Sequence, residues 1–402
     1  MNNETKKGKL VPELRFPGFE GEWPIQPLSN FLHEHKTKSD GKSRVHSVSV
    51  SKGVVDQVEY LGRSFAASDT SKYNLAKPND IIYTKSPTGS FPYGIVKMNK
   101  KPYNVIVSPL YGVYSPTNKY IGYILDSYFE SPERTNTYLS TLIQKGAKNT
   151  IQITNSTFIS KNVCFPTDEA EQQKIAECLS SVDNLIQAEA DQLQALKDHK
   201  KGLMQQLFPQ EGETTPKLRF PGFEGEWEEK KLGEVCDITA GGDVPKQKFS
   251  KEKTNIFNIP IISNGVGDNS IYGYTDFPKI TKKAVTVAAR GTIGYSEYRD
   301  YPYYPIIRLL SVVSKDSTIL DTKFLSFILS LQKYDVADAG IPQLTVPMIS
   351  SITISFPSLP EQQKIASCLS SLDDLIAAQQ EKVEALREHK KGLMQKLFPT
   401  IN

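Results

Sequence analysis

Cysteine and histidine are scarce in this chain of 402 residues, which holds four of the former and five of the latter. None of the cysteines forms a C-x-x-C pair, whereas a zinc site needs clustered thiolate or imidazole ligands. The cysteines are Cys164, Cys178, Cys236 and Cys368. Their scatter predicts neither a metal site nor a disulfide scaffold.

Long apolar runs and common catalytic motifs are also missing. No stretch of about 18 apolar residues is present, so no membrane-spanning segment is predicted. The first residues, "MNNETKKGKLVPEL", are polar and lack the apolar core of a secretion signal, so we expect a cytoplasmic protein. We find neither a G-x-x-x-x-G-K-[ST] phosphate loop nor an Asn/Asp-Pro-Pro-aromatic motif. ATP hydrolysis and amino-methylation by the chain itself are therefore not indicated.

Internal repeats organise the whole sequence. The decapeptide "LRFPGFEGEW" occupies residues 14–23 and recurs letter for letter at residues 218–227. A longer block beginning "EQQKIA" and ending "LFP" covers residues 171–209 and, without a gap, residues 361–399. The chain is thus two copies of one plan: a short shared segment, a variable region and a long shared segment.

The long shared blocks are predicted to be helices, because Ala, Leu, Gln, Glu and Lys dominate and Gly and Pro are nearly absent. Their apolar residues recur at alternating steps of four and three, which is typical of a coiled-coil seam. Two amphipathic helices packed on their own domains are the alternative. The seam residues are Ile175, Leu179, Val182, Ile186, Leu193 and Leu196 in the first block, and Ile365, Leu369, Leu372, Ile376, Val383 and Leu386 in the second.

The variable regions carry short β-type runs such as "DIIYT" and "KAVTVAA", punctuated by Gly, Pro and Asn. We predict an α+β fold in which two mixed α/β domains are joined by two long helices. The helices form an antiparallel coiled coil, and the whole chain is an internal pseudo-two-fold repeat. The expected parts are a shared segment at 1–23, a first domain at 24–166, a central helix at 167–209, a linker with the second shared segment at 210–227, a second domain at 228–357 and a C-terminal helix at 358–402.

Charge differs between the two variable regions. The first has 17 Lys and Arg against 9 Asp and Glu, whereas the second has 15 against 14. In the second, Arg290, Arg299 and Arg308, with nearby lysines and tyrosines, are expected to form a local basic face. A solvated lysine surface explains the same charges without any partner.

The duplicated decapeptide, the duplicated "EQQKIAxCLSSxDxLI" helices, the turn "RGTIG" and two dissimilar intervening regions resemble the DNA-specificity subunit of type I restriction-modification systems. The resemblance covers essentially the whole chain. It implies that each variable region is a target-recognition domain reading one half of a bipartite site in double-stranded DNA, and that the helices set the gap. It also implies two docked modification subunits and, through the complex, restriction subunits. S-adenosylmethionine, ATP and magnesium would be bound by these partners, and the chain itself would need no cofactor and be no enzyme.

Lysines, arginines and hydroxyl side chains on the recognition loops are the expected DNA contacts. The candidates are Lys85, Ser86, Thr88 and Lys97 in the first domain, and Lys282, Lys283, Arg290 and Thr292 in the second. Arg290 is the strongest candidate, because it precedes a glycine at a turn after a β-run and a guanidinium can pair with guanine. Bracing of that turn through backbone carbonyls is its alternative role.

The aromatic residues of the decapeptides have two open interpretations: they dock a partner subunit, or they clasp the adjacent helix end. These residues are Phe16, Phe19, Trp23, Phe220, Phe223 and Trp227. Under the pseudo-two-fold repeat, the C-terminus of the chain should lie near Leu14. A different function also remains open, that of a non-catalytic scaffold in which adhesion-like or RNA-binding domains sit on a coiled-coil rod.

Overall fold

The computed structural model describes residues 10–145, 151–334 and 342–399, and the chain divides into two compact units. The first unit comprises Met1–Ala190 and Glu381–Asn402, and the second comprises Asp191–Gln380. Each unit therefore contains part of both long helices, α5 (Glu169–Leu207) and α9 (Leu359–Leu397). Among the described residues, no helix has the length and apolarity needed to cross a membrane.

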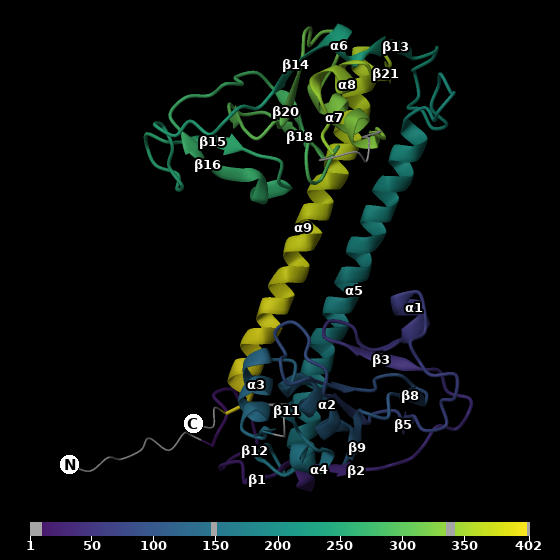
Figure 1. Ribbon diagram of the computed structural model, residues 1–402, viewed down its shortest axis with the longest axis vertical. Helices are drawn as coiled ribbons and strands as arrows, with labels where there is room; N and C mark the ends of the chain where they lie inside the picture. Colours follow the sequence, from purple (N-terminus) through teal and green to yellow (C-terminus); the bar gives the residue numbers. More distant parts are fainter. Residues whose placement is uncertain (1–9, 146–150, 335–341, 400–402) are drawn as a thin grey trace, which may run out of the picture. The chain divides into compact units, whose positions relative to one another are not determined.

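The first unit is a mixed α/β domain (Figure 1). Its strands are β1 (Ile25–Pro27), β2 (Leu32–Glu34), β3 (His46–Ser49), β4 (Gly53–Asp56), β5 (Asn74–Ala76), β6 (Ile81–Thr84), β7 (Ile95–Met98), β8 (Val105–Val107), β9 (Gly112–Pro116), β10 (Gln144–Lys145), β11 (Ile151–Gln152) and β12 (Asn162–Cys164). Its shorter helices are α1 (Gln57–Leu61), α2 (Lys119–Tyr128), α3 (Pro132–Ser140) and α4 (Asn155–Phe158), with a 3-10 turn at Leu28–Asn30.

The second unit has the same class of architecture. Its strands are β13 (Glu228–Lys231), β14 (Cys236–Ala240), β15 (Ile259–Ile262), β16 (Ile271–Thr275), β17 (Ala284–Val287), β18 (Ser296–Arg299), β19 (Tyr304–Pro305), β20 (Leu310–Ser314) and β21 (Thr353–Phe356). Its shorter helices are α6 (Leu232–Val235), α7 (Thr322–Leu331) and α8 (Val346–Ser350), with a 3-10 turn at Gly267–Ser270.

The two units repeat one sheet plan. In the first, four antiparallel strands lie in the order β2-β9-β6-β7, and in the second the order is β14-β20-β17-β18. A separate pair, β1-β12 in the first and β13-β21 in the second, precedes each long helix. The helix that follows the last strand of the sheet in chain order, β9 or β20, begins in both units at a side-chain cap, Asn118 for α2 and Asp321 for α7. These parallels confirm the internal repeat expected from the sequence.

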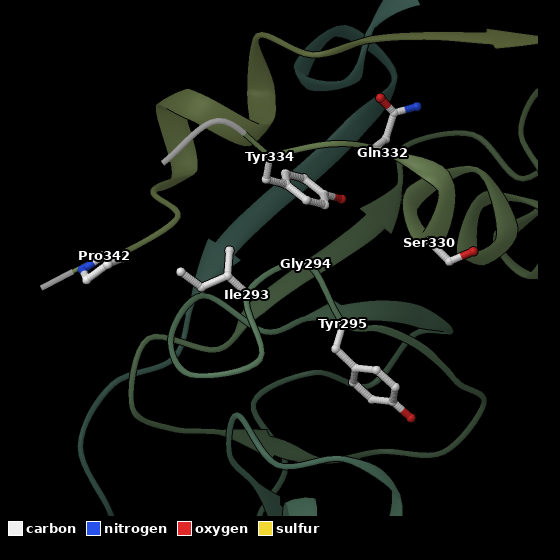
Figure 2. Close-up of a pocket in the computed structure, with 7 residues that line it drawn as sticks. All are labelled: Ile293, Gly294, Tyr295, Ser330, Gln332, Tyr334 and Pro342. Carbon is white, nitrogen blue, oxygen red and sulfur yellow. The ribbon is translucent and has the colours of Figure 1, made fainter. Parts of the chain in front are cut away.

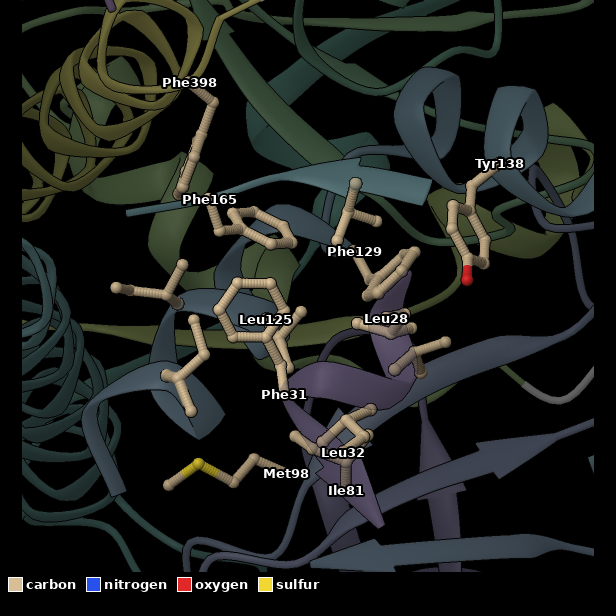
Figure 3. Packing of buried hydrophobic residues seen from close by; sticks show 14 of the residues in the cluster. Leu28, Phe31, Leu32, Ile81, Met98, Leu125, Phe129, Tyr138, Phe165 and Phe398 are labelled. Atoms are coloured by element: carbon tan, nitrogen blue, oxygen red, sulfur yellow. The ribbon is translucent and has the colours of Figure 1, made fainter. Parts of the chain in front are cut away.

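Each main sheet is buried on both faces because successive strand residues point to opposite sides. In β6, Ile81 and Tyr83 join the large core of the unit, whereas Ile82 joins a smaller core on the other face. In β17, Val285 and Val287 face the large core and Ala284 the smaller one. Figure 3 shows the large core of the first unit, where aromatic rings from several elements meet. This double burial explains why "IIYT" reads as a continuous apolar run.

The ends of the heptad pattern belong to the domain cores, which is a correction to the seam expected over the whole helix. Ile175 and Leu179 lie in the large core of the first unit, and Ile365 and Leu369 lie in that of the second. Farther along the helices most heptad positions are half-buried, as in a pair of helices with one side open to solvent. Among the apolar residues at these middle positions, Val383 is buried, at 3% exposed. Both the coiled-coil interpretation and its alternative therefore hold, each for a different part of the helix.

Candidate nucleic-acid interface and helix clasps

The first decapeptide contacts the first turn of α5 through a buried ion pair. Arg15 donates from Nε to Oε1 of Glu171 at 2.7 Å and from Nη2 to Oε2 at 2.9 Å. Glu171 is only 3% exposed, and it also accepts a hydrogen bond from Nε1 of Trp23 at 3.2 Å. Two charge-assisted bonds to one carboxylate fix its orientation as well as its charge.

The second decapeptide repeats this contact at the start of α9. Arg219 donates from Nε and Nη2 to the two carboxylate oxygens of Glu361 at 2.7 and 2.8 Å. This pairing raises the pKa of Arg219, through its hydrogen bond to Glu361 first. Trp227 is 4% exposed, but within the described residues its Nε1 has no hydrogen-bond partner. The two clasps thus differ by one hydrogen bond.

Each decapeptide also binds the end of the other long helix within its unit. The amide of Leu14 donates to the carbonyl of Lys396 at 3.0 Å, and that of Leu218 donates to Gln206 at 2.9 Å. The C-terminus itself, which was expected near Leu14, lies outside the described residues, but the end of α9 just before it contacts Leu14. Of the four phenylalanines, Phe16 and Phe220 pack against the large cores, and all four are half-buried; they are Phe16, Phe19, Phe220 and Phe223.

The glutamine after each clasped glutamate ties the helix start to the domain. Gln172 donates to the carbonyl of Pro166 at 2.7 Å and accepts from Asn118, the cap of α2, at 2.8 Å. Gln362 donates to Pro357 at 2.8 Å and accepts from the amide of Asp321, the cap of α7, also at 2.8 Å. Sequence inspection did not single out these residues, although their signal was present in the repeated "EQQ".

Lysines that interrupt the heptad pattern form ion pairs between the long helices. In the first unit, Nζ of Lys390 lies 2.7 Å from Asp183. In the second, Nζ of Lys200 lies 2.5 Å from Asp373, the residue that corresponds to Asp183 in the repeat. In the first unit, Nζ of Lys382 also lies 2.7 Å from Glu189. Residue numbers therefore rise along α5 from Asp183 to Glu189 as they fall along α9 from Lys390 to Lys382, so the paired segments of this unit run antiparallel.

Three of the four DNA-contact candidates in the first domain lie in one exposed connection. Lys85, Ser86 and Thr88 follow β6 and are exposed before the chain returns in β7. Lys97 is different: it lies within β7, is 8% exposed, and its charge helps to lower the pKa of the buried Asp126. A side chain held in the core beside a carboxylate is poorly placed to reach DNA, so the structure argues against Lys97.

The candidates in the second domain do not form one cluster. Lys282 and Lys283 precede β17, whereas Arg290 and Thr292 follow it, so the strand separates the two pairs. The guanidinium of Arg290 donates to Oε1 of Gln343, from Nε at 2.9 Å and from Nη2 at 2.5 Å. This bond occupies the guanidinium, although its acceptor is the side chain of Gln343 and not the backbone carbonyls of the turn that the alternative role called for.

Arg299 is not part of the basic face that was expected on this domain. This residue is 5% exposed, and its guanidinium is held by Glu297 at 2.8 Å and by the hydroxyl of Tyr301 at 2.7 Å. Arg308, in contrast, is exposed, and the described part of the structure shows no hydrogen bond or ion pair of its side chain. Of the three arginines, Arg308 is the one whose side chain points to solvent without a partner among the described residues.

Arg308 lies in a tight turn with an unusual backbone. The amide of Leu309 donates to the carbonyl of Ile306 at 3.0 Å, and the two central residues, Ile307 and Arg308, have φ of 53° and 63°. Turns with two left-handed central residues normally use Gly, Asn or Asp. The left-handed conformation costs an ordinary L-residue about 1 to 2 kcal/mol, and a β-branched residue there is a genuine outlier.

Neighbouring segments hold this turn in place. The carbonyls of Gly242 and Gly241 accept from the amides of Ile307 at 2.9 Å and Arg308 at 3.1 Å. A Cβ on Gly241 would lie 2.7 Å from the amide nitrogen of Ile306, so only glycine fits this approach. Nδ2 of Asn264 donates to the carbonyl of Ile307 at 2.6 Å.

Asn264 also ties the turn to the "RGTIG" segment. Its Oδ1 accepts from the amide of Ala289 at 2.8 Å, and its carbonyl accepts from the hydroxyl of Thr292 at 3.3 Å. One residue therefore binds the Ile307 turn and both flanks of Arg290. These segments form a continuous surface at the end of β17.

An open cavity of about 500 Å³ lies beside the same segment. Figure 2 shows Ile293, Gly294 and Tyr295 on one side, with residues from α7 and the chain after it on the other. A Cβ on Gly294 would lie 2.5 Å from the ring of Tyr334, and its φ is +86°, so the close ring contact requires glycine. The described lining residues include no charged side chain, which makes this cavity a poor site for phosphate or metal. The described residues also contain no group of three or more His, Cys, Asp or Glu that could hold a metal ion.

Two copies of one α/β domain with dissimilar loops, each tied to paired helices by the same clasp, define a modular protein built to present two recognition surfaces. The chain belongs to the type I restriction modification DNA specificity domain family, whose model matches residues 52–198 and 224–387. The resemblance noted in the sequence is thereby confirmed. The match does not favour the alternative of an adhesion-like or RNA-binding scaffold.

Curated relatives carry the same description. A putative type I specificity subunit of Mycoplasma pneumoniae, S.MpnORF89P, is 36% identical over 151 residues, covering 36% of this chain and 44% of that protein. A second from the same organism, S.MpnORF507P, is 34% identical over 212 residues, covering 52% of this chain and 54% of that protein. The chain thus spans about half the length of these relatives.

Solved structures show the same fold. The S subunit of a type I restriction-modification system from M. genitalium superimposes with a TM-score of 0.65 at 15% identity, covering 98% of this chain and all of that one. A chain from a structure on complex assembly and conformational transition of the type I R-M system gives a TM-score of 0.54 at 17% identity, covering 96% of this chain and 98% of that one. Two mixed domains with long helices, as expected from the sequence, are therefore confirmed as the fold.

Proposed function

We propose that this chain is the DNA sequence-specificity subunit of a type I restriction-modification complex and that it acts in the cytoplasm. Each α/β domain, within residues 24–166 and 228–357, reads one half of a bipartite site in double-stranded DNA. The observation that supports this is the family match to both copies, whose main sheets share one strand order while their loops differ. Two related scaffolds with different loops are suited to reading two different half-sites.

Recognition divides between phosphates and bases. Exposed lysines on the loops, such as Lys85, Lys282 and Lys283, neutralise phosphates and make binding sensitive to salt. A smaller number of side chains reach the base edges in the major groove and select the sequence. The chain supplies recognition, while methyl transfer and cleavage, with S-adenosylmethionine, ATP and magnesium, belong to partner subunits.

The decapeptides act as clasps in this proposal. Their tryptophans are buried against the cores, and their arginines are committed to Glu171 and Glu361, so neither group is free to bind a partner. Two equivalent clasped helix ends nevertheless offer two equivalent surfaces, and we expect two modification subunits per chain. Native mass measurement of the saturated complex tests this, and a complex with a single modification subunit would contradict it.

Exchange of one domain tests the central proposal. Residues 228–357 are replaced by the corresponding region of another family member, and the chain is expressed with its modification subunit. Methylome sequencing should show that one half of the methylated motif changes and the other half persists. As a matched control, the reciprocal exchange of residues 24–166 should change the opposite half. Loss of both halves in a folded, assembled variant would refute independent recognition.

The long helices are proposed to set the spacing between half-sites. Four residues inserted after Ala190 and four after Gln380 lengthen each helix by about 6 Å. Because B-DNA advances about 34 Å in ten base pairs, the spacer should grow by one or two base pairs while both half-sites persist. The control is the same insertion after Gly212, which lies in the exposed linker and should leave the spacer unchanged. An active helix variant with its original spacer would refute the proposal.

A further inference from the structure

We propose that the strained turn at Ile307 and Arg308 is the base-reading tip of the second domain, with Arg308 rather than Arg290 contacting a base edge and Ile307 packing against the neighbouring base. This inference rests on the proposed function and assigns it to particular side chains. It is carried by the backbone of the turn, by the exposure of the two side chains and by their bonds to neighbouring segments.

The backbone gives the first step. Ile307 and Arg308 both adopt the left-handed conformation that favours glycine, although a sequence such as Asn-Gly would form this turn without strain. Strained residues persist where the surrounding structure holds them and are concentrated at functional sites. Here Gly241, Gly242 and Asn264 hold the turn, so its geometry is maintained against the preference of its own residues.

The side chains give the second step. Ile307 is 45% exposed, next to a guanidinium that has no partner among the described residues. An exposed aliphatic group gains nothing from a phosphate, but it can contact the methyl group of thymine in the major groove. A free guanidinium can pair with both acceptor atoms of guanine. An apolar and a cationic side chain on adjacent residues therefore suit two adjacent base edges better than a phosphate backbone.

The position of the turn in the fold gives the third step. It precedes β20, and the connection before the corresponding strand β9 of the first domain also presents an exposed aliphatic residue, Leu110, at 74% exposed. There, too, an asparagine side chain braces the turn: Nδ2 of Asn74 donates to the carbonyl of Tyr111 at 2.9 Å. The same place in both domains thus carries a solvent-exposed aliphatic tip with a side-chain brace.

The contacts of the "RGTIG" segment explain why Arg290 is a weaker candidate for a base contact than Arg308. The side chain of Arg290 is occupied by Gln343, and its flanking residues are bonded to the asparagine that also holds the Ile307 turn. The guanidinium of Arg290 is therefore already bonded, whereas that of Arg308 is exposed and has no partner among the described residues.

The decisive variant replaces both turn residues, Ile307→Asn with Arg308→Gly, in the full chain expressed with its modification subunit. Relief of the left-handed strain should raise the Tm by about 3 to 8 °C. At the same time the second half of the methylated motif should lose its sequence preference, while the first half persists. A variant that becomes more stable and keeps both halves unchanged would overturn the inference, because the turn would then be structural only.

Two further variants separate the contacts. Arg308→Gln removes the guanidinium that matches the two acceptors of guanine and supplies a side chain that pairs with adenine instead, so preference for guanine at one base position should fall by about ten- to a hundredfold. Unchanged discrimination would mean a phosphate contact and would overturn the assignment of Arg308. As the matched control, Leu110→Ser should alter the first half-site and leave the second intact.

The same experiments distinguish this inference from the proposed function. If the wild-type chain specifies a bipartite motif and the Asn-Gly variant specifies the same motif, only the inference fails. If the wild-type chain specifies no motif, the proposed function fails and the inference fails with it. If the variant is folded but no longer binds the modification subunit in a mass measurement, the turn is a protein-docking site, which also refutes base reading.

Discussion

The two clasps differ by one hydrogen bond, which predicts that equivalent substitutions cost the two units different amounts of free energy. Glu171 accepts from both Arg15 and Trp23. Among the described residues, the side chain of Glu361 accepts hydrogen bonds from Arg219 alone. Replacing Arg15 with Met leaves one donor on the buried carboxylate, whereas Arg219→Met leaves none.

The difference can be estimated from the burial of the carboxylates. Breaking a buried ion pair costs about 3 to 5 kcal/mol, because the remaining charge is left in a poorly solvated place. Glu361 is 1% exposed, so Arg219→Met should fall in this range. The hydrogen bond that Glu171 keeps from Trp23 is worth about 1.5 to 3 kcal/mol. Arg219→Met should therefore destabilise the second unit by about 1.5 to 3 kcal/mol more than Arg15→Met destabilises the first.

The protein carries its own reporters for this measurement. Its two tryptophans, Trp23 and Trp227, lie one in each unit, next to the clasps. Arg15→Met is measured in a Trp227→Phe background and Arg219→Met in a Trp23→Phe background, by urea unfolding followed by tryptophan fluorescence. Arg→Lys variants serve as controls that keep the charge. Equal losses, or a larger loss for Arg15→Met, would refute the reasoning.

Further predictions concern buried charges of the first unit. Replacing Lys97 with Met should leave the methylated motif unchanged in methylome sequencing, because the side chain lies in the core; a changed half-site would return it to the DNA interface. Lys390→Met should cost more in urea unfolding than the corresponding Lys200→Met, because it leaves two carboxylates without their shared cation, Glu130 and the 25% exposed Asp183, whereas Lys200→Met leaves only Asp373, which is 45% exposed, and should cost about 1 kcal/mol or less. Burial raises the pKa of Asp126, but the nearby lysines, Lys100 first, outweigh this and hold it below 3.8. A lowered carboxyl pKa stabilises the fold above the unfolded value, so this contribution should be lost as the pH falls below about 3.8, and Asp126→Asn should flatten the decline seen by Trp23 fluorescence.

The repeats predicted the fold well because both copies of each shared segment form the same structure. A heptad pattern and a duplicated decapeptide are visible without knowing any contact, and they led to two domains and long helices. The same pattern could not show that Ile175 and Ile365 pack into domain cores. An apolar residue at a heptad position looks alike whether it faces a helix or a sheet.

The candidate DNA contacts were harder to predict, because exposure and pairing depend on tertiary structure. Lys97 and Arg299 are as basic as Lys85 in sequence, yet the fold buries them beside carboxylates. Arg290 follows a strand and precedes glycine, which suggested an exposed loop arginine, but Gln343, distant in sequence, occupies it. The sequence gives no sign of a turn at Ile307 and Arg308, because turns are predicted from Gly, Pro, Asn, Asp or Ser and these two residues are of none of those types.

The shared and variable segments differ in how well their residues suit the local backbone conformation. In the clasps the residues suit their backbone: glycines take the left-handed positions of the decapeptides, and each arginine pairs with a buried glutamate. In the Ile307 turn the residues oppose their backbone, and glycines and an asparagine from other segments hold it. A segment that only stabilises the fold is expected to carry residues that suit its backbone. A segment that binds a partner can carry residues that do not, because its side chains are selected for their contacts. A turn that would be more stable as Asn-Gly, held in a rigid frame with its arginine facing solvent, is therefore better explained by recognition than by folding.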